Sequence, residues 1–217
     1  MPLVRVVFYL DVLSSWSYIA DRAVEKLEEK YSGDVEFEWR IAQLFEFGPL
    51  PYSREELEWY YGRTARVTGV ELNAAWVDSP QTTTVYANQA AEAARLLGAA
   101  GSHVRRGLTK AALLDGKFVG RRDVALEIAA RLSGLSADRL SEAMDSAAVR
   151  DRIAETTREY AALPCSQLPA FVIRSAIDDT AIFSGLYTAD SLETALGEML
   201  HAAQVNRDYG NPPQVAS

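Results

Sequence analysis

Residues 8–18 read Phe-Tyr-Leu-Asp-Val-Leu-Ser-Ser-Trp-Ser-Tyr, and the segment Ser14-Ser15-Trp16-Ser17 within them decides the interpretation of the chain. This segment follows an apolar strand-like run and precedes an amphipathic helical pattern, so we expect it to begin a helix. Backbone N–H groups and the positive end of the helix dipole are directed outward at such a start. Proteins that exchange thiols place Cys-x-x-Cys at this junction, because the helix terminus lowers the pKa of a thiol. Here serine occupies both cysteine positions.

The sequence around this segment predicts a strand, a helix and a second strand. Residues 4–10 are apolar on both faces, which is typical of a central strand. Residues 15–31 have helical spacing of apolar side chains, with Gly33 as a stop signal. Residues 35–41 alternate between apolar and charged, which predicts a half-buried strand. Together they predict a right-handed βαβ unit.

A long helical block follows. Gly48, Pro49 and Pro51 interrupt the chain, and Ser53 with Glu56 forms a capping-box signature for a helix over 54–66. Strand signals are then missing until about residue 160, and glycines stand at several of the joints between helical segments. We expect these helices near 82–97, 103–115, 122–133, 137–145 and 147–161.

The last part of the chain predicts a hairpin and a helix. Residues 170–173 and 181–183 read as two strands, and Thr188 is the expected N-cap of the final helix. The tail after His201 is expected to be loose or to pack peripherally. We therefore expect an α/β protein in which residues 1–44 and 163–203 form a discontinuous thioredoxin-like domain. Residues 45–162 are its helical insertion, and residues 204–217 are a C-terminal tail.

This order and its motifs resemble the DsbA-like branch of the thioredoxin superfamily. The branch includes DsbA- and FrnE-type disulfide oxidoreductases, kappa-class glutathione transferases and 2-hydroxychromene-2-carboxylate isomerases. The resemblance spans nearly the whole chain. It rests on the helical block and on three motifs: Phe8-Tyr9-Leu10-Asp11 with Ser14-Ser15-Trp16-Ser17-Tyr18, Gln167-Leu168-Pro169-Ala170-Phe171-Val172-Ile173, and Phe183-Ser184-Gly185.

The resemblance implies a thioredoxin-like fold with an inserted all-helical domain and a cis Leu168–Pro169 bond. It implies that Ser14 contacts the sulfur of glutathione, as the matching serine does in the transferases and isomerases. The chain departs from the redox members at both cysteines. It also has Gln167 where they have glycine, and Leu186 where they often have glutamine.

Composition excludes several other functions. The 217 residues carry 30 acidic and 22 basic side chains, and the net charge of −8 disfavours nucleic acid and anionic membranes as partners. The one cysteine, Cys165, cannot form an internal disulfide, and with two histidines a metal site is not expected. No signal peptide or membrane span is evident, so we expect a soluble, cytoplasmic protein.

Ser14 has two interpretations. Its hydroxyl can donate a hydrogen bond to a bound thiolate and thereby lower the pKa of that thiol. Serine is also an ordinary N-cap residue whatever the function. As a nucleophile Ser14 is unconvincing, because the sequence gives no reason to place His103 or His201 beside it as a base.

The other candidate residues also have two interpretations each. Ser15, Trp16 and Ser17 are expected to complete the thiol-binding turn, although Ser17 is most simply the degenerate second cysteine. Introduced Cys→Ser replacements would look the same. Leu168 and Pro169 either pair with the backbone of an extended ligand or form only a rigid turn. Ser184 and Gly185 either help to bind a carboxylate at a helix start or form a tight turn.

Cys165 is expected to be inert rather than reactive. Aromatic residues on the insertion side suggest an apolar cleft, a dimer surface or simple core: Trp16, Phe45, Phe47, Trp59, Tyr60, Tyr61 and Trp76. Arginines could form a basic patch or solvated helix faces: Arg63, Arg66, Arg105, Arg106, Arg121 and Arg122.

The leading prediction is a glutathione-dependent transferase or isomerase that acts on an apolar electrophile, without a metal and with a possible homodimer. One alternative is a relative of the disulfide oxidoreductases that is redox-inactive because its cysteines are missing. Another is a thioredoxin fold that binds a peptide or a protein partner.

Overall fold

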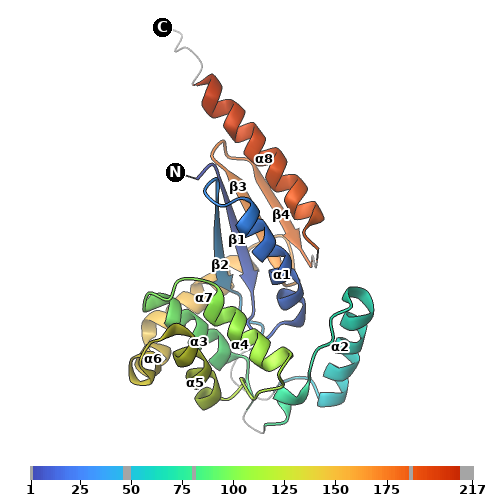
Figure 1. Ribbon diagram of the computed structural model, residues 1–217, viewed down its shortest axis with the longest axis vertical. Helices are drawn as coiled ribbons and strands as arrows, with labels where there is room; N and C mark the ends of the chain where they lie inside the picture. The colour runs from blue at the N-terminus through green and yellow to red at the C-terminus, as the bar shows by residue number, and fades with distance from the viewer. Residues whose placement is uncertain (1, 46–49, 80–81, 186–187, 211–217) are drawn as a thin grey trace.

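The computed structural model describes residues 2–45, 50–79, 82–185 and 188–210, and within them a four-stranded sheet forms the centre (Figure 1). β1 pairs in parallel with β2 and antiparallel with β3, and β3 pairs antiparallel with β4. The order across the sheet is β2-β1-β3-β4, so β1 is a central strand, as its apolar sequence predicts. The strands are β1 (Val4–Leu10), β2 (Val35–Ile41), β3 (Ala170–Ser175) and β4 (Thr180–Ser184).

Helices cover both faces of the sheet. α1 (Ser15–Lys30) is the crossover between the parallel strands β1 and β2, and α8 (Asp190–Tyr209) lies beside it over the same face (Figure 1). An ion pair between Lys30 and Glu193 joins these two helices. On the other face, Tyr160 of α7 (Ala147–Ala161) packs against a cluster that contains Val7 and Tyr9 of β1.

The remaining helices gather beyond the carboxyl end of β1 (Figure 1). α3 contacts α4, α5, α6 and α7 and is the centre of this bundle, whereas α2 stands apart and contacts α1. This part of the chain contains α2 (Arg54–Thr68), the short 3-10 helix η1 (Ala75–Val77), α3 (Val85–Leu96), α4 (His103–Leu113), α5 (Arg122–Ser133) and α6 (Ala137–Met144), followed by α7.

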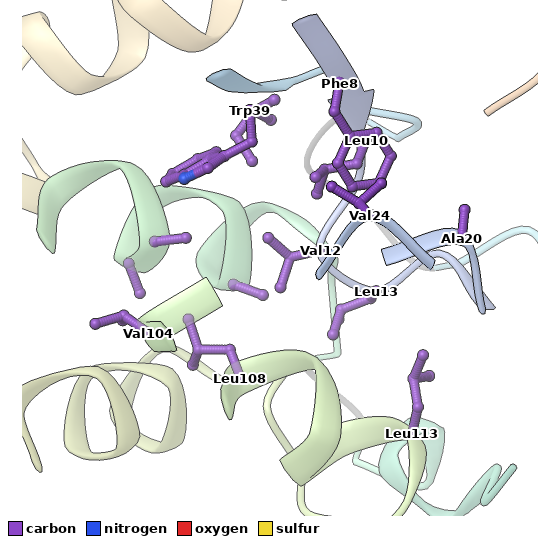
Figure 2. Packing of buried hydrophobic residues seen from close by; sticks show 14 of the residues in the cluster. Phe8, Leu10, Val12, Leu13, Ala20, Val24, Trp39, Val104, Leu108 and Leu113 are labelled. Atoms are coloured by element: carbon purple, nitrogen blue, oxygen red, sulfur yellow. The ribbon is translucent and has the colours of Figure 1, made fainter. Parts of the chain in front are cut away.

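One continuous hydrophobic core joins the sheet to this helical part. Figure 2 shows Phe8 and Leu10 of β1 at one end of the cluster and Leu108 of α4 at the other, with Val12 and Leu13 between them. All five side chains are buried. The position of the helical part relative to the N-terminus of α1 is therefore fixed by packing, because a shift would open cavities in the shared core.

A buried ion pair also fixes α1. Both side chains of Asp21 and Arg105 are almost fully buried, and the guanidinium donates to the carboxylate at 2.7 and 3.0 Å. Arg106 contacts the same carboxylate and also pairs with Glu25 and Glu28 of α1. These contacts tie α1 to α4 along its length.

The strands and helices predicted from the sequence are present, with bounds that differ by a few residues. One expectation at the C-terminal end was wrong. α8 begins at Asp190 with Ala189 as N-cap and no side-chain cap bond, so Thr188 does not cap it. Acidic Asp190 and Glu193 in its first turn supply the favourable charge instead. The helix also continues to Tyr209, so residues 204–209 are helical rather than loose.

Some sequence predictions concern residues that the structure does not describe. Phe47, Gly48 and Pro49, the departure at Leu186 and the end of the tail from residue 211 onward lie outside the described residues.

Candidate functional site

A cavity of about 470 Å³ lies where the loop after β1, the start of α1, α2 and the loop before β3 meet. Its walls are mostly apolar, with the leucines Leu13, Leu44, Leu50 and Leu57 among them. Aromatic side chains make up much of the rest: Trp16, Phe45, Tyr52, Tyr60, Tyr61 and Trp76. Such volume and lining are typical of small-molecule sites, which fall between roughly 300 and 1,000 Å³.

The start of α1 contributes Ser14, Ser15 and Trp16 to this cavity. Ser14 is the N-cap, and its Oγ accepts a hydrogen bond from the Ser17 N–H at 3.2 Å. The Ser14 hydroxyl proton is donated to no partner among the described residues, so it is available to a ligand. The first turn of α1 also contains no acidic residue. The positive end of this helix is therefore not neutralised by its own side chains.

Asp11 supports the loop that leads into α1. This carboxylate is fully buried and accepts hydrogen bonds from the backbone N–H groups of Leu13 and Leu44 and from the Asn88 side chain, at 2.9 to 3.1 Å. Asn88 of α3 in turn accepts from the Val12 N–H at 3.0 Å. Burial raises the pKa of Asp11, and these hydrogen bonds only partly oppose it. The helical part thus holds the β1–α1 loop through a buried polar contact.

The loop before β3 lines the same cavity as Ser14. The Leu168–Pro169 peptide bond is cis, and Gln167 and Leu168 line the cavity. Neither the N–H nor the C=O of Leu168 forms a hydrogen bond to the described residues. An unpaired stretch of backbone can bind the main chain of an extended ligand.

Ser184 and Gly185 hold this loop in place. The Ser184 hydroxyl donates to the Gln167 C=O at 2.8 Å, and the Gly185 N–H donates to the Pro169 C=O at 2.8 Å. Gly185 has φ +70°, and a Cβ there would come within 2.9 Å of the Gln167 side chain. This position therefore requires glycine for both its conformation and its close approach.

Of the predicted site residues, Ser14, Ser15, Trp16, Leu168 and Gly185 line the same cavity. The structure does not bring Ser17, Pro169 and Ser184 to its wall. Ser17 is buried, and its hydroxyl has no hydrogen-bond partner among the described residues. Pro169 and Ser184 act on the cavity through the loop contacts above. Acidic Asp190 and Glu193 begin α8, so its N-terminus is a poor place for a ligand carboxylate.

The aromatic residues divide between the cavity wall and its surroundings. Trp76 is buried, and its Nε1–H donates to the Tyr61 hydroxyl at 3.1 Å. Burial raises the pKa of Tyr61 to about 12, so this hydroxyl stays protonated at neutral pH. Trp59 is 64% exposed and contacts Tyr60 edge to face.

The six arginines do not form a common basic patch. Arg105 and Arg106 bind carboxylates of α1, Arg121 pairs with Asp123, and Arg122 pairs with Asp145. These ion pairs compensate their charge locally. Arg63 differs from these four, because it lines the cavity.

Sequence reasoning missed several residues of the cavity wall. Asp11 was noted only as part of a motif, Gln167 only as a departure from the redox members, and Tyr52 and Thr84 were not singled out. The one usable signal was that Asp11 is a carboxylate directly after a buried strand, where a charge needs partners. Those partners come from Leu44 and Asn88, which are distant in sequence and become neighbours only in the fold.

The sequence matches the family of DSBA-like thioredoxin domains over residues 5–197. The chain belongs to this family. None of the curated proteins searched matches the sequence.

Solved structures show the same DSBA-like fold. A protein from Nitrosomonas europaea, assigned provisionally as a disulfide isomerase, superposes with a TM-score of 0.78 at 16% identity, covering 92% of this chain and 98% of that one. The cytosolic disulfide reductase DsbM from Pseudomonas aeruginosa superposes with a TM-score of 0.75 at 18% identity, covering 91% of this chain and 99% of that one. DsbM has also been solved with GSH.

A 2-hydroxychromene-2-carboxylate isomerase gives a TM-score of 0.58 at 16% identity, covering 95% of this chain and 100% of that one. At these identities the likeness shows the fold alone. Solved structures with this fold thus include a disulfide reductase and an isomerase, and the present chain has serine at positions 14 and 17.

Cys165 does not replace the missing thiols. It is partly buried, packs against a cluster that contains Leu168, and does not line the cavity. Neither His103 nor His201 lines the cavity, which leaves Ser14 without a histidine as general base. The described residues hold no cluster of three metal-binding side chains, and none of their helices has both the length and the apolarity of a membrane span.

Proposed function

We propose that this DSBA-like protein binds glutathione at the start of α1 and holds it as a thiolate for reaction with an apolar electrophile. The observation that carries the proposal is the Ser14 hydroxyl, whose proton is unused within the described residues and whose helix has no acidic residue in its first turn. A hydroxyl donor and a helix dipole both favour the charged form of a thiol and lower its pKa.

The other walls of the cavity suit the remaining parts of such a reaction. The unpaired backbone of Leu168 can bind the main chain of the tripeptide, as an added strand does. The aromatic and leucine side chains can take up an apolar electrophile and exclude water. Both partners would then be held in one cavity, which favours their reaction by proximity.

The chemistry needs no further reagent. In a transferase the thiolate attacks an electrophilic carbon, a carbon–sulfur bond forms, and the leaving group departs with its electron pair. In an isomerase the thiolate adds to a conjugated carbon, the adduct changes geometry, and the same carbon–sulfur bond then breaks to release the thiolate. Ser14 contributes only by stabilising the thiolate before attack and after release.

A second candidate function is the binding of a peptide or protein segment without catalysis. It is favoured by the exposed aromatic side chains beside the cavity, because Tyr52, Trp59 and Tyr60 are each more than one third exposed. Such side chains are enriched at protein interfaces. A homodimer could use the same surface.

We also place the protein in the cytoplasm, where glutathione is abundant. The acidic composition and the scarcity of cysteine support this location, and the DsbM neighbour is described as cytosolic.

Thermal unfolding with millimolar glutathione tests the proposal, because a ligand that binds the folded state raises the melting temperature. We expect a rise with glutathione and a smaller one with S-methylglutathione, which lacks the thiol. Ser14→Ala should abolish that difference. Absence of any shift would overturn glutathione binding. Conjugation of glutathione to chlorodinitrobenzene then separates a transferase from a binding protein.

A further inference from the structure

Arg63 of α2 is a cation at the wall of the cavity that the thiol site does not use. Its guanidinium carbon lies 5.9 Å from the ring centres of Trp16, Trp59 and Tyr60 alike. Contacts of this kind hold a guanidinium beside aromatic rings by cation–π attraction. The N–H groups point outward in the plane of the guanidinium, and they remain available to an acceptor.

Arg63 forms no ion pair with the described residues, although carboxylates are abundant in this chain. Arg54 on the same helix provides the contrast, because it binds both Glu58 and Asp78. Asp11 also lines the cavity, but its oxygens already accept from Leu13, Leu44 and Asn88. Among the described residues no carboxylate pairs with Arg63, so its positive charge can serve a group that enters from solvent.

The other residues of the cavity wall indicate what kind of molecule would carry the anionic group that pairs with Arg63. The cavity has about 470 Å³ lined by leucines and aromatic rings, which favours a flat apolar body of the size of two or three fused or linked rings. A cation at the side of such a cavity binds an anionic substituent on that body. The thiol site at Ser14 lies on α1, whereas Arg63 lies on α2, so the two groups can serve different ligands.

We infer that Arg63 is a specificity-determining residue that selects a flat apolar organic anion as the second ligand of this cavity. In so far as that ligand is the electrophile, the inference rests on the proposed glutathione function. The binding of an apolar anion to Arg63 does not depend on it and can be measured without glutathione.

Two dyes that differ in one charged group provide the test. Anilinonaphthalene sulfonate and neutral phenylnaphthylamine share the same aromatic body, and both report binding by fluorescence. We expect Arg63→Gln to weaken binding of the sulfonate about fivefold, as for the loss of a partly exposed charge pair, and to leave phenylnaphthylamine unchanged. Arg63→Lys should recover part of the loss. Arg66→Gln on the same helix removes an equal charge outside the cavity wall and should affect neither dye.

Three outcomes would overturn the inference. If Arg63→Gln weakens both dyes equally, Arg63 acts by packing rather than by charge. If it weakens neither, the charge does not reach the cavity. If glutathione affinity falls while sulfonate affinity does not, the arginine serves the thiol ligand instead. A wild-type protein that binds the sulfonate through Arg63 but binds no glutathione would leave this inference standing and refute the proposed function.

Discussion

The N-termini of α1 and α2 are both capped by a serine, but they differ in their acidic residues and in their exposure to solvent. At α2, Ser53 accepts from the Glu56 N–H at 3.2 Å, and the Glu56 carboxylate accepts from the Ser53 N–H at 2.7 Å. Glu55 adds a second acid to this exposed first turn. At α1, Ser14 accepts from the Ser17 N–H at 3.2 Å, no acidic residue follows, and the turn faces a cavity.

The difference separates a cap that serves only its helix from one that can serve a ligand. The two acids at α2 satisfy a backbone donor and interact with the positive end of the dipole. The first turn of α1 contains no acidic residue to make that interaction. Ser14 stabilises its helix as Ser53 does, yet its proton and the helix dipole remain available.

The largest expected effect concerns how the two N-termini are supported. Asn88→Ala should destabilise the protein by about 2–3 kcal/mol, because the buried Val12 N–H loses its acceptor and Asp11 loses a donor. Glu56→Ala at α2 should cost less than about 1 kcal/mol, because its bond is exposed to water. Urea unfolding measures both. Equal losses would mean that the helical part does not support the start of α1.

A change of charge at the two first turns should have the next largest effect. Ser15→Glu places an acid in the first turn of α1, and we expect it to weaken glutathione binding about fivefold through the dipole and like-charge repulsion. Ser15→Gln controls for size, and Glu55→Gln makes the reverse change at α2. Calorimetric titration would contradict the account if the Glu and Gln variants at position 15 bound glutathione equally.

The pH dependence of the stability should reflect the buried carboxyl group of Asp11, which supports the loop before α1. Burial raises the pKa of Asp11 above its ordinary value of 3.8, so the folded state holds this proton more tightly than the unfolded state. Stability from this group is therefore present at low pH and lost as the pH rises through the folded pKa. The melting temperature of the wild type minus that of Asp11→Asn should fall as the pH rises from about 4. A constant or rising difference would contradict the shift.

The smallest expected difference is between the stability losses caused by removing the two N-cap hydroxyls. Ser14→Ala and Ser53→Ala should each cost about 1 kcal/mol, since each removes one hydroxyl acceptor from a helix start. Chemical unfolding of the two variants should give nearly equal losses. A much larger loss at Ser14 would mean that its role is mainly structural.

Local signals explain why the fold could be predicted. Ser53 with Glu56, the glycines with positive φ at 98, 116 and 134, and the apolar run of β1 specify their elements through neighbours in sequence. Thr188 shows the limit of such signals, because Ala189 takes the N-cap position of α8 although a threonine directly precedes it.

The site was predictable only in part. Ser14 and Leu168 could be placed together because the resemblance to the DsbA-like branch implied it. The aromatic residues suggested an apolar cleft among other possibilities, but the approach of Arg63 and Tyr52 could not be predicted, because the position of α2 and the loop before it depends on packing against α1. The sequence also could not show whether the Ser184 side chain faces a ligand or holds a loop, because its hydrogen-bond partner, Gln167, is distant in sequence.

The ionisation of bound glutathione tests the central claim most directly. The ultraviolet absorbance of the thiolate, followed during a pH titration of saturated complexes, gives the thiol pKa in the wild type, in Ser14→Ala and in Ser53→Ala. We predict a thiol pKa well below that of free glutathione in the wild type and in Ser53→Ala, and a return toward the free value in Ser14→Ala. An unshifted pKa in the wild type, or the same shift in all three proteins, would contradict the account.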